Sequence, residues 1–252
     1  MIRKVSVLMP CYNNVSTPRA HFNFWAAIES ICNQDYENWE LIAVNDGSTD
    51  DTGTVLDDIA SEKKRVKVVH LPKNSGIGAA LNAAAATATG EYLARMDSDD
   101  MSVVYRLATQ ARILDDNPEI GITGSGMWVI DDNDHIIMEI VRPSLHEDIL
   151  RFCIGHGCPF VHGSVMMRRH VFEDVGGYAD RSEWSCEDFE LWFRILSTFR
   201  GHNFPEPMYF YRHLTQALSK QNAERIARDT SRVIEMFHKR FVDVLYDGTK
   251  PA

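Results

Sequence analysis

The sequence lacks the features that mark disulfide-rich, zinc-ribbon and membrane-spanning proteins. It has five cysteines, an odd number, and no CxxC pair, so neither a disulfide framework nor a zinc ribbon is predicted. The apolar stretch at residues 5–9 is too short for a signal peptide and stops at Pro10, and no apolar run approaches the ~20 residues that span a bilayer. We therefore expect a soluble protein in the reducing cytoplasm, with its cysteines in the core or in loops.

Positive charge is also scarce, since 26 Lys and Arg against 36 Asp and Glu give a net charge of −10. A nucleic-acid partner requires a basic face and is excluded. A small phosphate compound stays compatible, because a divalent cation and backbone N–H groups can neutralise it. Residues 74–78 lack the third glycine of a dinucleotide loop, and Gly76 is not followed by the Gly-Lys-Ser/Thr of a P-loop. A Rossmann dehydrogenase and a P-loop enzyme are therefore excluded.

What the sequence does contain is an alternation of apolar strand-like runs and helical periods, typical of an α/β fold with right-handed crossovers. No Gly/Ser linker divides the chain, so the second half is expected to extend the same sheet. The expected strands are 5–9, 41–44, 66–71, 91–96, 120–130 and 136–141, and the expected helices include 76–89, one that ends near Asn117, and one that follows Cys186.

Residues 223–245 place apolar side chains at helical spacing. The expected helix packs on the domain or on a partner, and binding at a membrane surface is the alternative. Its apolar face comprises Ile226, Val233, Ile234, Phe237, Phe241 and Leu245.

Acidic side chains follow two of the expected strands. Asp97, Asp99 and Asp100 come directly after strand 91–96, and Asp46 follows the strand at 41–44. Such acids often only cap turns and helices. Ligands in open α/β sheets, however, gather at the carboxyl ends of the strands. Oxygen ligands favour Mg²⁺ or Mn²⁺ over zinc, so the sequence predicts a site for one of these cations.

Polar and aromatic residues end the first strand in the same layer. Pro10, Tyr12 and Asn13 are candidates for nucleotide binding, because the Tyr ring can stack on a base, although a loop Tyr can equally rest on the core. Asp46 can accept the N3–H of a uracil-type base. Residues 45–52 also read as a plain strand, tight turn and helix cap.

A second acidic pair, Glu187 and Asp188, falls in the first turn of the helix that follows Cys186. Acids there complement the helix dipole, and the same field keeps a carboxylate ionised as a general base for a sugar hydroxyl requires. Trp184 and His162 are candidate acceptor contacts, with core packing as the alternative for the Trp.

These motifs together resemble family 2 of the inverting glycosyltransferases, over roughly residues 3–220. The matching segments are Pro10-Cys11-Tyr12-Asn13, Asn45-Asp46-Gly47-Ser48-Thr49-Asp50, Ala94-Arg95-Met96-Asp97-Ser98-Asp99-Asp100, Gly176-Gly177-Tyr178 and Glu187-Asp188-Phe189-Glu190-Leu191-Trp192. The resemblance implies the GT-A fold, a single Rossmann-like and mostly parallel mixed sheet flanked by helices. It also implies a nucleotide-sugar donor.

Roles for individual residues follow from the same resemblance. Asp46 would read the base, Asp97 the ribose, and Asp99 would hold the metal on the diphosphate. Asp188 would be the catalytic base and Glu187 its neighbour in the acceptor site. Ser98 and Asn74 complete the expected nucleotide-binding set.

One departure from the family pattern concerns a histidine. Many relatives have Tyr-Arg-x-His followed by Ser, whereas Leu214 takes the His position here and Ser219 stands where the Ser is expected. His213 is therefore a weak candidate metal ligand, and Arg212 is an alternative contact for the phosphates.

The sequence thus predicts a metal-dependent enzyme that moves a sugar from a UDP-sugar to a glycan or lipid-linked glycan, in cell-surface polysaccharide synthesis. Its location would be the cytoplasm, with peripheral association at the inner face of the membrane and homo-oligomerisation left open. The expected domain spans residues 1–220, with a nucleotide half (1–100) and an acceptor half (101–220), followed by a helical extension at 221–252. A nucleotidyltransferase and a non-catalytic sugar-binding module are the alternatives.

Overall fold

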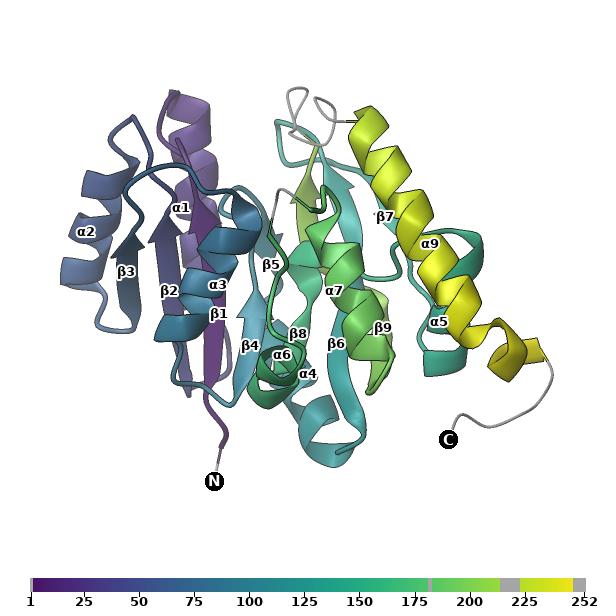
Figure 1. Ribbon diagram of the computed structural model, residues 1–252. Coiled ribbons are helices and arrows are strands. Elements are labelled where there is room, and N and C mark those ends of the chain that lie inside the picture. The colour runs from purple at the N-terminus through teal and green to yellow at the C-terminus, as the bar shows by residue number, and fades with distance from the viewer. Residues whose placement is uncertain (1, 181–182, 214–222, 247–252) are drawn as a thin grey trace.

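The chain folds around one continuous β-sheet (Figure 1). The structure is a computed structural model that describes residues 2–180, 183–213 and 223–246. In that part of the chain the sheet has nine strands in the order β3-β2-β1-β4-β8-β6-β9-β5, and β7 pairs with β6 off this path. The strands are β1 (Val5–Cys11), β2 (Trp39–Asn45), β3 (Val66–His70), β4 (Tyr92–Arg95), β5 (Met101–Ser102), β6 (Ile120–Ile130), β7 (Ile136–Ile140), β8 (Met166–Arg168) and β9 (Arg200–Arg212).

The sheet is mixed, and most of its strands share one direction. The pairs β3-β2, β2-β1 and β1-β4 are parallel, as are β6 and β9. Strands β8, β5 and β7 run antiparallel to their neighbours. The expected mostly parallel mixed sheet is confirmed, and the second half of the chain extends the same sheet as predicted.

Helices cover both faces of the sheet. Buried side chains of α1, α2 and α4 share one hydrophobic cluster, and those of α3, α5, α6, α7 and α9 share the other. Figure 1 shows α3, α7 and α9 in front of the sheet. The helices are α1 (Pro18–Cys32), α2 (Thr52–Glu62), α3 (Ile77–Thr87), α4 (Arg106–Asp116), α5 (His146–Gly155), α6 (Arg169–Asp174), α7 (Glu187–Leu196) and α9 (Ala223–Tyr246), with a 3₁₀ turn at His162–Ser164.

The central strands are mostly apolar, and helices cover both of their faces. All seven residues of β2 are buried, which is the pattern of a parallel strand inside a three-layer fold. Helix α1 begins where Thr17 accepts a hydrogen bond from the Ala20 N–H at 3.1 Å and Pro18 occupies the first turn, both of which favour a helix start.

The register of these strands brings the predicted acids to one edge of the sheet. Cys11 pairs with Asn45 at the ends of β1 and β2, and the N–H of Met96, just after β4, donates to the Leu8 carbonyl at 3.0 Å. Asp46 and Asp97 therefore leave the sheet at the same carboxyl edge, where ligands of α/β sheets bind.

Helix α9 packs against the domain, as one of the two predicted alternatives stated. Val233, Phe237 and Phe241 are buried in the cluster that α7 also joins, and Ile234 and Leu245 lie against it. No helix in the described ranges is both long enough and apolar enough to cross a membrane. The proposed domain boundary at 220 falls outside the described residues.

Candidate active site

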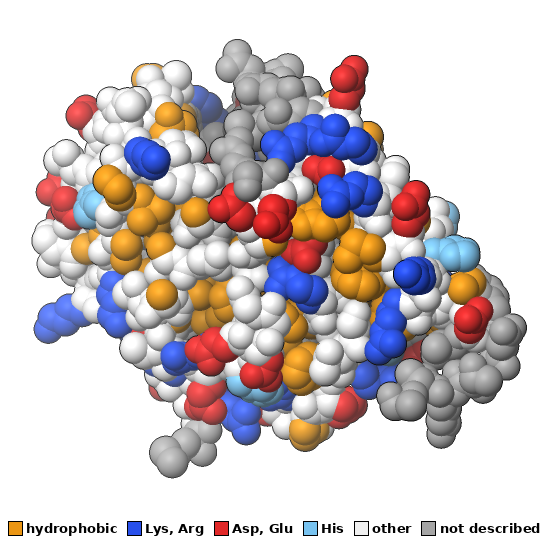
Figure 2. Space-filling view, viewed as in Figure 1, with side chains coloured by type: hydrophobic (Ala, Val, Ile, Leu, Met, Phe, Trp, Pro, Cys, Tyr) orange, Lys and Arg blue, Asp and Glu red, His pale blue; other side chains and the backbone are white. Residues whose placement is uncertain are grey.

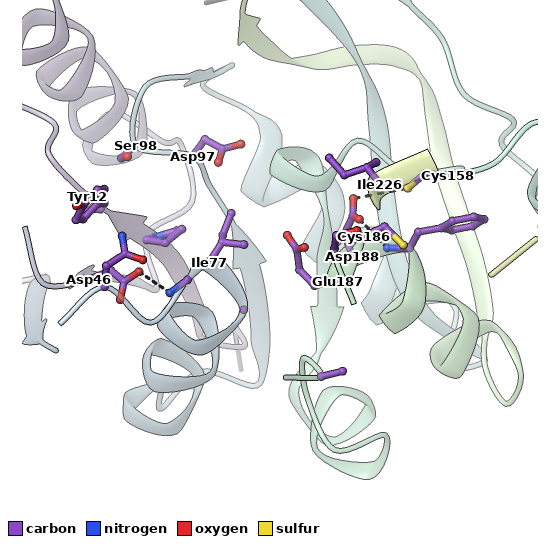
Figure 3. A pocket seen from close by; sticks show the side chains of 18 of the residues that line it. Tyr12, Asp46, Ile77, Asp97, Ser98, Cys158, Cys186, Glu187, Asp188 and Ile226 are labelled. Atoms are coloured by element: carbon purple, nitrogen blue, oxygen red, sulfur yellow. Dashed lines mark hydrogen bonds between the residues drawn. The ribbon is translucent and has the colours of Figure 1, made fainter. Parts of the chain in front are cut away.

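A cavity of about 750 Å³ opens at the carboxyl edge of the sheet and is lined from two sides. Figure 3 shows Tyr12, Asp46 and Asp97 on one side and Glu187 and Asp188 on the other. Nine residues predicted for the site line it: Pro10, Tyr12, Asp46, Asn74, Asp97, Ser98, Asp99, Glu187 and Asp188. Residues from opposite ends of the chain therefore form one site.

Asp46 joins the end of β2 to the loop that precedes α3. Its two carboxylate oxygens accept the backbone N–H groups of Ser75 at 2.7 Å and Gly76 at 2.9 Å. Gly47 follows with φ +66°, and a Cβ there would lie 2.3 Å from the carbonyl carbon of Lys73. The turn thus needs glycine, and each Asp46 oxygen keeps one further lone pair for a ligand.

The loop after β1 combines an aromatic side chain that lines the cavity with amides that bond the protein itself. Tyr12 is 45% exposed and lines the cavity. Asn13 does not line it, since its side chain accepts the Thr49 N–H at 2.8 Å and its own N–H donates to Ser48 at 3.0 Å. Its neighbour Asn14 does line the cavity and donates to the Ser98 hydroxyl at 2.8 Å.

The loop after β4 carries three crowded carboxylates. Asp97 pairs with Arg95, which is buried beneath it, and accepts the Tyr209 hydroxyl at 3.2 Å. Burial, followed by the charge of Asp97, raises the pKa of Asp99 to about 6. The same two causes raise the pKa of Asp100 well above its usual range. Nearby positive charge in the cavity would therefore be stabilised.

The donor set of this loop fits a hard divalent cation. Asp97 and Asp99 both line the cavity, and they offer oxygen atoms only. The described part of the chain holds no group of three or more His, Cys, Asp or Glu arranged as metal ligands. Mg²⁺ and Mn²⁺ are commonly held by one or two carboxylates together with substrate phosphates, so a third protein ligand is not required.

The last residue of β9, Arg212, contacts the acidic loop that follows β4. Asp100 accepts the Arg212 N–H at 2.7 Å, and the Arg212 guanidinium donates to the Asp99 carbonyl at 3.1 Å. The Arg212 side chain is fully buried and also pairs with Asp134. His213 is exposed and lies outside the cavity. Neither residue reaches the cavity, and Leu214 and Ser219 lie outside the described residues.

On the opposite wall, Asp188 faces the cavity from the first turn of α7. One carboxylate oxygen accepts the Phe189 N–H at 2.7 Å, and the other lies 3.7 Å from the Cys158 sulfur. Burial raises the pKa of Asp188. Among the described residues, the side chain that bonds this carboxylate is a weak thiol donor, so lone pairs remain for a substrate proton.

The two other predicted acceptor contacts do not line the cavity. His162 bonds the Tyr178 hydroxyl at 2.8 Å, and burial lowers the pKa of this imidazole well below its usual value. The ring of Trp184 packs 4.3 Å from the guanidinium carbon of Arg232 on α9. Both side chains thus have partners within the protein.

Several cavity residues were not predicted from the sequence. Arg225, Ile226 and Thr230 come from α9, and Cys158, Ser185 and Cys186 come from the segments before and beside Asp188. The apolar period of α9 had indicated a packing helix and included Ile226 in its face. No local pattern signals that the first turns of this helix border a site.

Comparison with known proteins identifies the family. The model of glycosyl transferase family 2 matches residues 6–176, and the chain belongs to this family. The chain is 34% identical over 226 residues to EpsE of Bacillus subtilis, across 87% of this chain and 76% of that protein. It is 32% identical over 190 residues to the O-antigen biosynthesis glycosyltransferase WbnJ of Escherichia coli, across 74% of this chain and 72% of that protein. The resemblance read from the motifs is confirmed.

Solved structures confirm the fold. The mannosyltransferase PcManGT from Pyrobaculum calidifontis, in complex with GDP-Man and Mn²⁺, aligns with a TM-score of 0.72 at 18% identity over 93% of this chain and 65% of that one. TarS 1–349 from S. aureus, in complex with UDP-GlcNAc, aligns with a TM-score of 0.70 at 19% identity over 95% and 67%. The chain spans 40% of a longer TarS structure.

Proposed function

We propose that this glycosyltransferase is metal-dependent and inverting, and that it moves a sugar from a UDP-sugar to a hydroxyl group. The observation that carries the proposal is one cavity with oxygen ligands for a cation on one wall and a helix-borne carboxylate on the other. The diphosphate of a donor needs a cation to neutralise its charge, which the oxygen ligands of the first wall can hold. The hydroxyl of an acceptor needs a general base, which the carboxylate of the second wall can supply.

In this mechanism Asp188 acts as the general base. A divalent cation held by Asp99, with Asp97 beside it, would neutralise the charge of the departing diphosphate. Asp188 takes the proton of the acceptor hydroxyl while its oxygen attacks the anomeric carbon from the face opposite to the diphosphate. One C–O bond forms as the other breaks, so the configuration inverts and no covalent sugar–protein intermediate is needed. The raised pKa of Asp188 makes it a stronger base.

Asp46 is the residue we assign to base recognition. It is 4% exposed and lines the cavity, and its free lone pairs can accept the N3–H of uracil. Cytosine offers an acceptor at N3 and would repel this carboxylate. Guanine also has N–H donors, so Asp46 alone does not separate UDP from GDP.

UDP is therefore expected to bind more tightly than CDP. Competition of UDP, GDP and CDP against a fluorescent UDP analogue, in the presence of Mn²⁺, measures the order. Equal displacement by UDP and CDP would remove Asp46 from this role. Tighter binding of GDP would move the proposed donor to a GDP-sugar and leave the carboxylate assignment in place.

Turnover tests the enzymatic assignment against a non-catalytic module. The purified chain, incubated with Mn²⁺ and each of a panel of UDP-sugars, should release UDP faster than a sample without protein. Thermal shifts identify the preferred donor, because a ligand at 100 times its dissociation constant adds about 2.7 kcal/mol to the free energy of unfolding. Stabilisation by a donor without UDP release, with or without glycan acceptors, would favour the binding module.

We place the reaction in cell-surface polysaccharide synthesis at the cytoplasmic face of the membrane. The similarity to an O-antigen biosynthesis glycosyltransferase supports this assignment. The acceptor would be a glycan or a lipid-linked glycan that enters beside Glu187. Peripheral membrane association and the expected division into a 1–220 domain and a 221–252 extension belong to the same proposal.

A further inference from the structure

Helix α9 contacts the short segment that leads into the catalytic helix. Residues 184–186 immediately precede Glu187 and Asp188, and α9 side chains contact all three, with Thr230 bonded to Cys186. Asp229 accepts both the N–H and the hydroxyl of Ser185, at 3.1 Å and 2.7 Å. Arg232 stacks on the ring of Trp184 at 4.3 Å.

Asp229 is unusual for an acid on a surface helix, because only 1% of it is exposed. Arg225, Arg228 and Arg232 approach its carboxylate at 3.7, 3.5 and 3.4 Å, and Figure 2 shows basic side chains gathered over the N-terminal part of α9. These are long contacts at exposed guanidinium groups, so they add little. The short bonds to Ser185 are the specific ones, since a buried carboxylate needs such donors.

The C-terminal part of α9 packs directly on α7. The Phe237 ring stacks on Phe189 at a centroid distance of 5.4 Å and meets Phe193 edge-on at 5.1 Å. Helices α7 and α9 thus share a buried aromatic contact, and Asp229 ties the start of α7 to the same helix. In Figure 3, Ile226 of α9 lies on the same side of the cavity as Asp188 and Cys186, and all three line it.

We propose that Asp229 is a positioning residue for the transfer reaction: through Ser185 it holds the start of α7 where the Asp188 carboxylate faces the acceptor. This inference rests on the proposed function of Asp188. It extends the active site to a helix that lies beyond the family match, which ends at residue 176. A general base displaced by about 1 Å can lose about 10²-fold in rate, so a bond that fixes its backbone has a measurable effect.

Three variants separate hydrogen bonding from charge and from overall stability. Asp229→Ala removes both bonds, Asp229→Asn keeps an acceptor oxygen but removes the charge, and Ser185→Ala removes the hydroxyl bond alone. Glu235→Gln is the matched control, because Glu235 is an exposed acid on the same helix. Turnover of the preferred UDP-sugar by the full chain is measured with the UDP dissociation constant.

We expect kcat to fall about tenfold in Asp229→Ala and about threefold in Ser185→Ala and Asp229→Asn, with the UDP dissociation constant unchanged. Asp229→Ala and Ser185→Ala should not be additive, because they remove the same interaction. Glu235→Gln should match the wild type. Unchanged kcat in both Asp229→Ala and Ser185→Ala would overturn the proposal, as would equal weakening of kcat and UDP binding.

Amide hydrogen exchange provides a readout that does not depend on turnover. In Asp229→Ala, or in Ser185→Ala where the first variant does not fold, peptides covering residues 183–190 should exchange faster while those covering β1 and β2 stay protected. Uniform loss of protection would indicate a general stabilising role and overturn the inference. A wild-type chain without turnover would overturn the proposed function alone, and the exchange pattern would then decide whether Asp229 holds this segment.

Discussion

Replacing Asp188 by Asn is expected to lower sugar transfer by about 10²-fold or more, the usual scale for loss of general-base assistance. Asn keeps the size of the side chain and can still accept the Phe189 N–H that now bonds Asp188 at 2.7 Å. UDP binding should stay close to normal, because Asp188 lies on the wall opposite Asp46 and Asp97 (Figure 3). Initial rates with a saturating donor, together with the UDP dissociation constant, test this expectation.

Glu187→Gln is the matched control for this variant, since it changes the neighbouring carboxylate in the same first turn. We expect a smaller loss, because Glu187 is assigned to acceptor positioning rather than to proton transfer. If Glu187→Gln abolished sugar transfer while Asp188→Asn kept a transfer rate within a few-fold of wild type, the roles of the two residues would be exchanged. Thermal unfolding of both variants checks that the fold is intact.

The pH dependence of kcat provides a second readout for Asp188. Burial raises its pKa, so the carboxylate loses its base form at a higher pH than an ordinary Asp, whose pKa is about 3.9. The acid limb of the wild-type profile should therefore lie above that value, with activity falling as the pH drops through the raised pKa. The residual activity of Asp188→Asn should lack this limb.

The fold was predicted best where helices bury both faces of a strand. Strand β6 covers Ile120–Ile130, the range predicted for it. Its Ile, Val, Trp and Thr residues favour a strand, and its three glycines disfavour a helix. Strand β8 spans only Met166–Arg168, too few residues for any period to emerge. Strand β9 contains Pro205 and Pro207, which argue against a strand in sequence. The structure accommodates Pro207 at a register shift opposite Gly126.

The sequence predicted those parts of the site that lie at the carboxyl ends of parallel strands. Asp46 and Asp97 end parallel neighbours of β1, so their proximity follows from topology alone. Packing decided the rest. Asp229 reaches Ser185 across 44 residues, and no local pattern encodes that contact. Trp184 had two equal interpretations in sequence, and the structure places its ring against Arg232.

Asp99→Asn is expected to abolish most of the metal-dependent part of UDP affinity while leaving the fold intact. Asp99 lines the cavity beside Asp97, and an amide is a much weaker ligand for a hard cation than a carboxylate. We expect the UDP dissociation constant with Mn²⁺ to rise by at least about tenfold, judging from the 10–100-fold effects of changes around metal ligands. Without the metal, wild type and variant should bind UDP alike. Asp132→Asn, at an exposed acid, is the control for the change in net charge.

Asp99→Asn should also change thermal stability, and the sign of the change should differ between the protein without ligands and the protein with Mn²⁺ and UDP. Burial and the charge of Asp97 raise the pKa of Asp99 to about 6, so at pH 7 its ionised form disfavours folding. This penalty shrinks as the pH falls from about 6 toward the unfolded-state pKa of about 3.9. Asp99→Asn removes that charge, so the metal-free variant should melt at the wild-type temperature or slightly above it. With Mn²⁺ and UDP the wild type should gain stability and the variant should gain little. Thermal unfolding with and without the two ligands measures both differences. A variant that keeps the full Mn²⁺-dependent gain would show that Asp99 does not hold the cation.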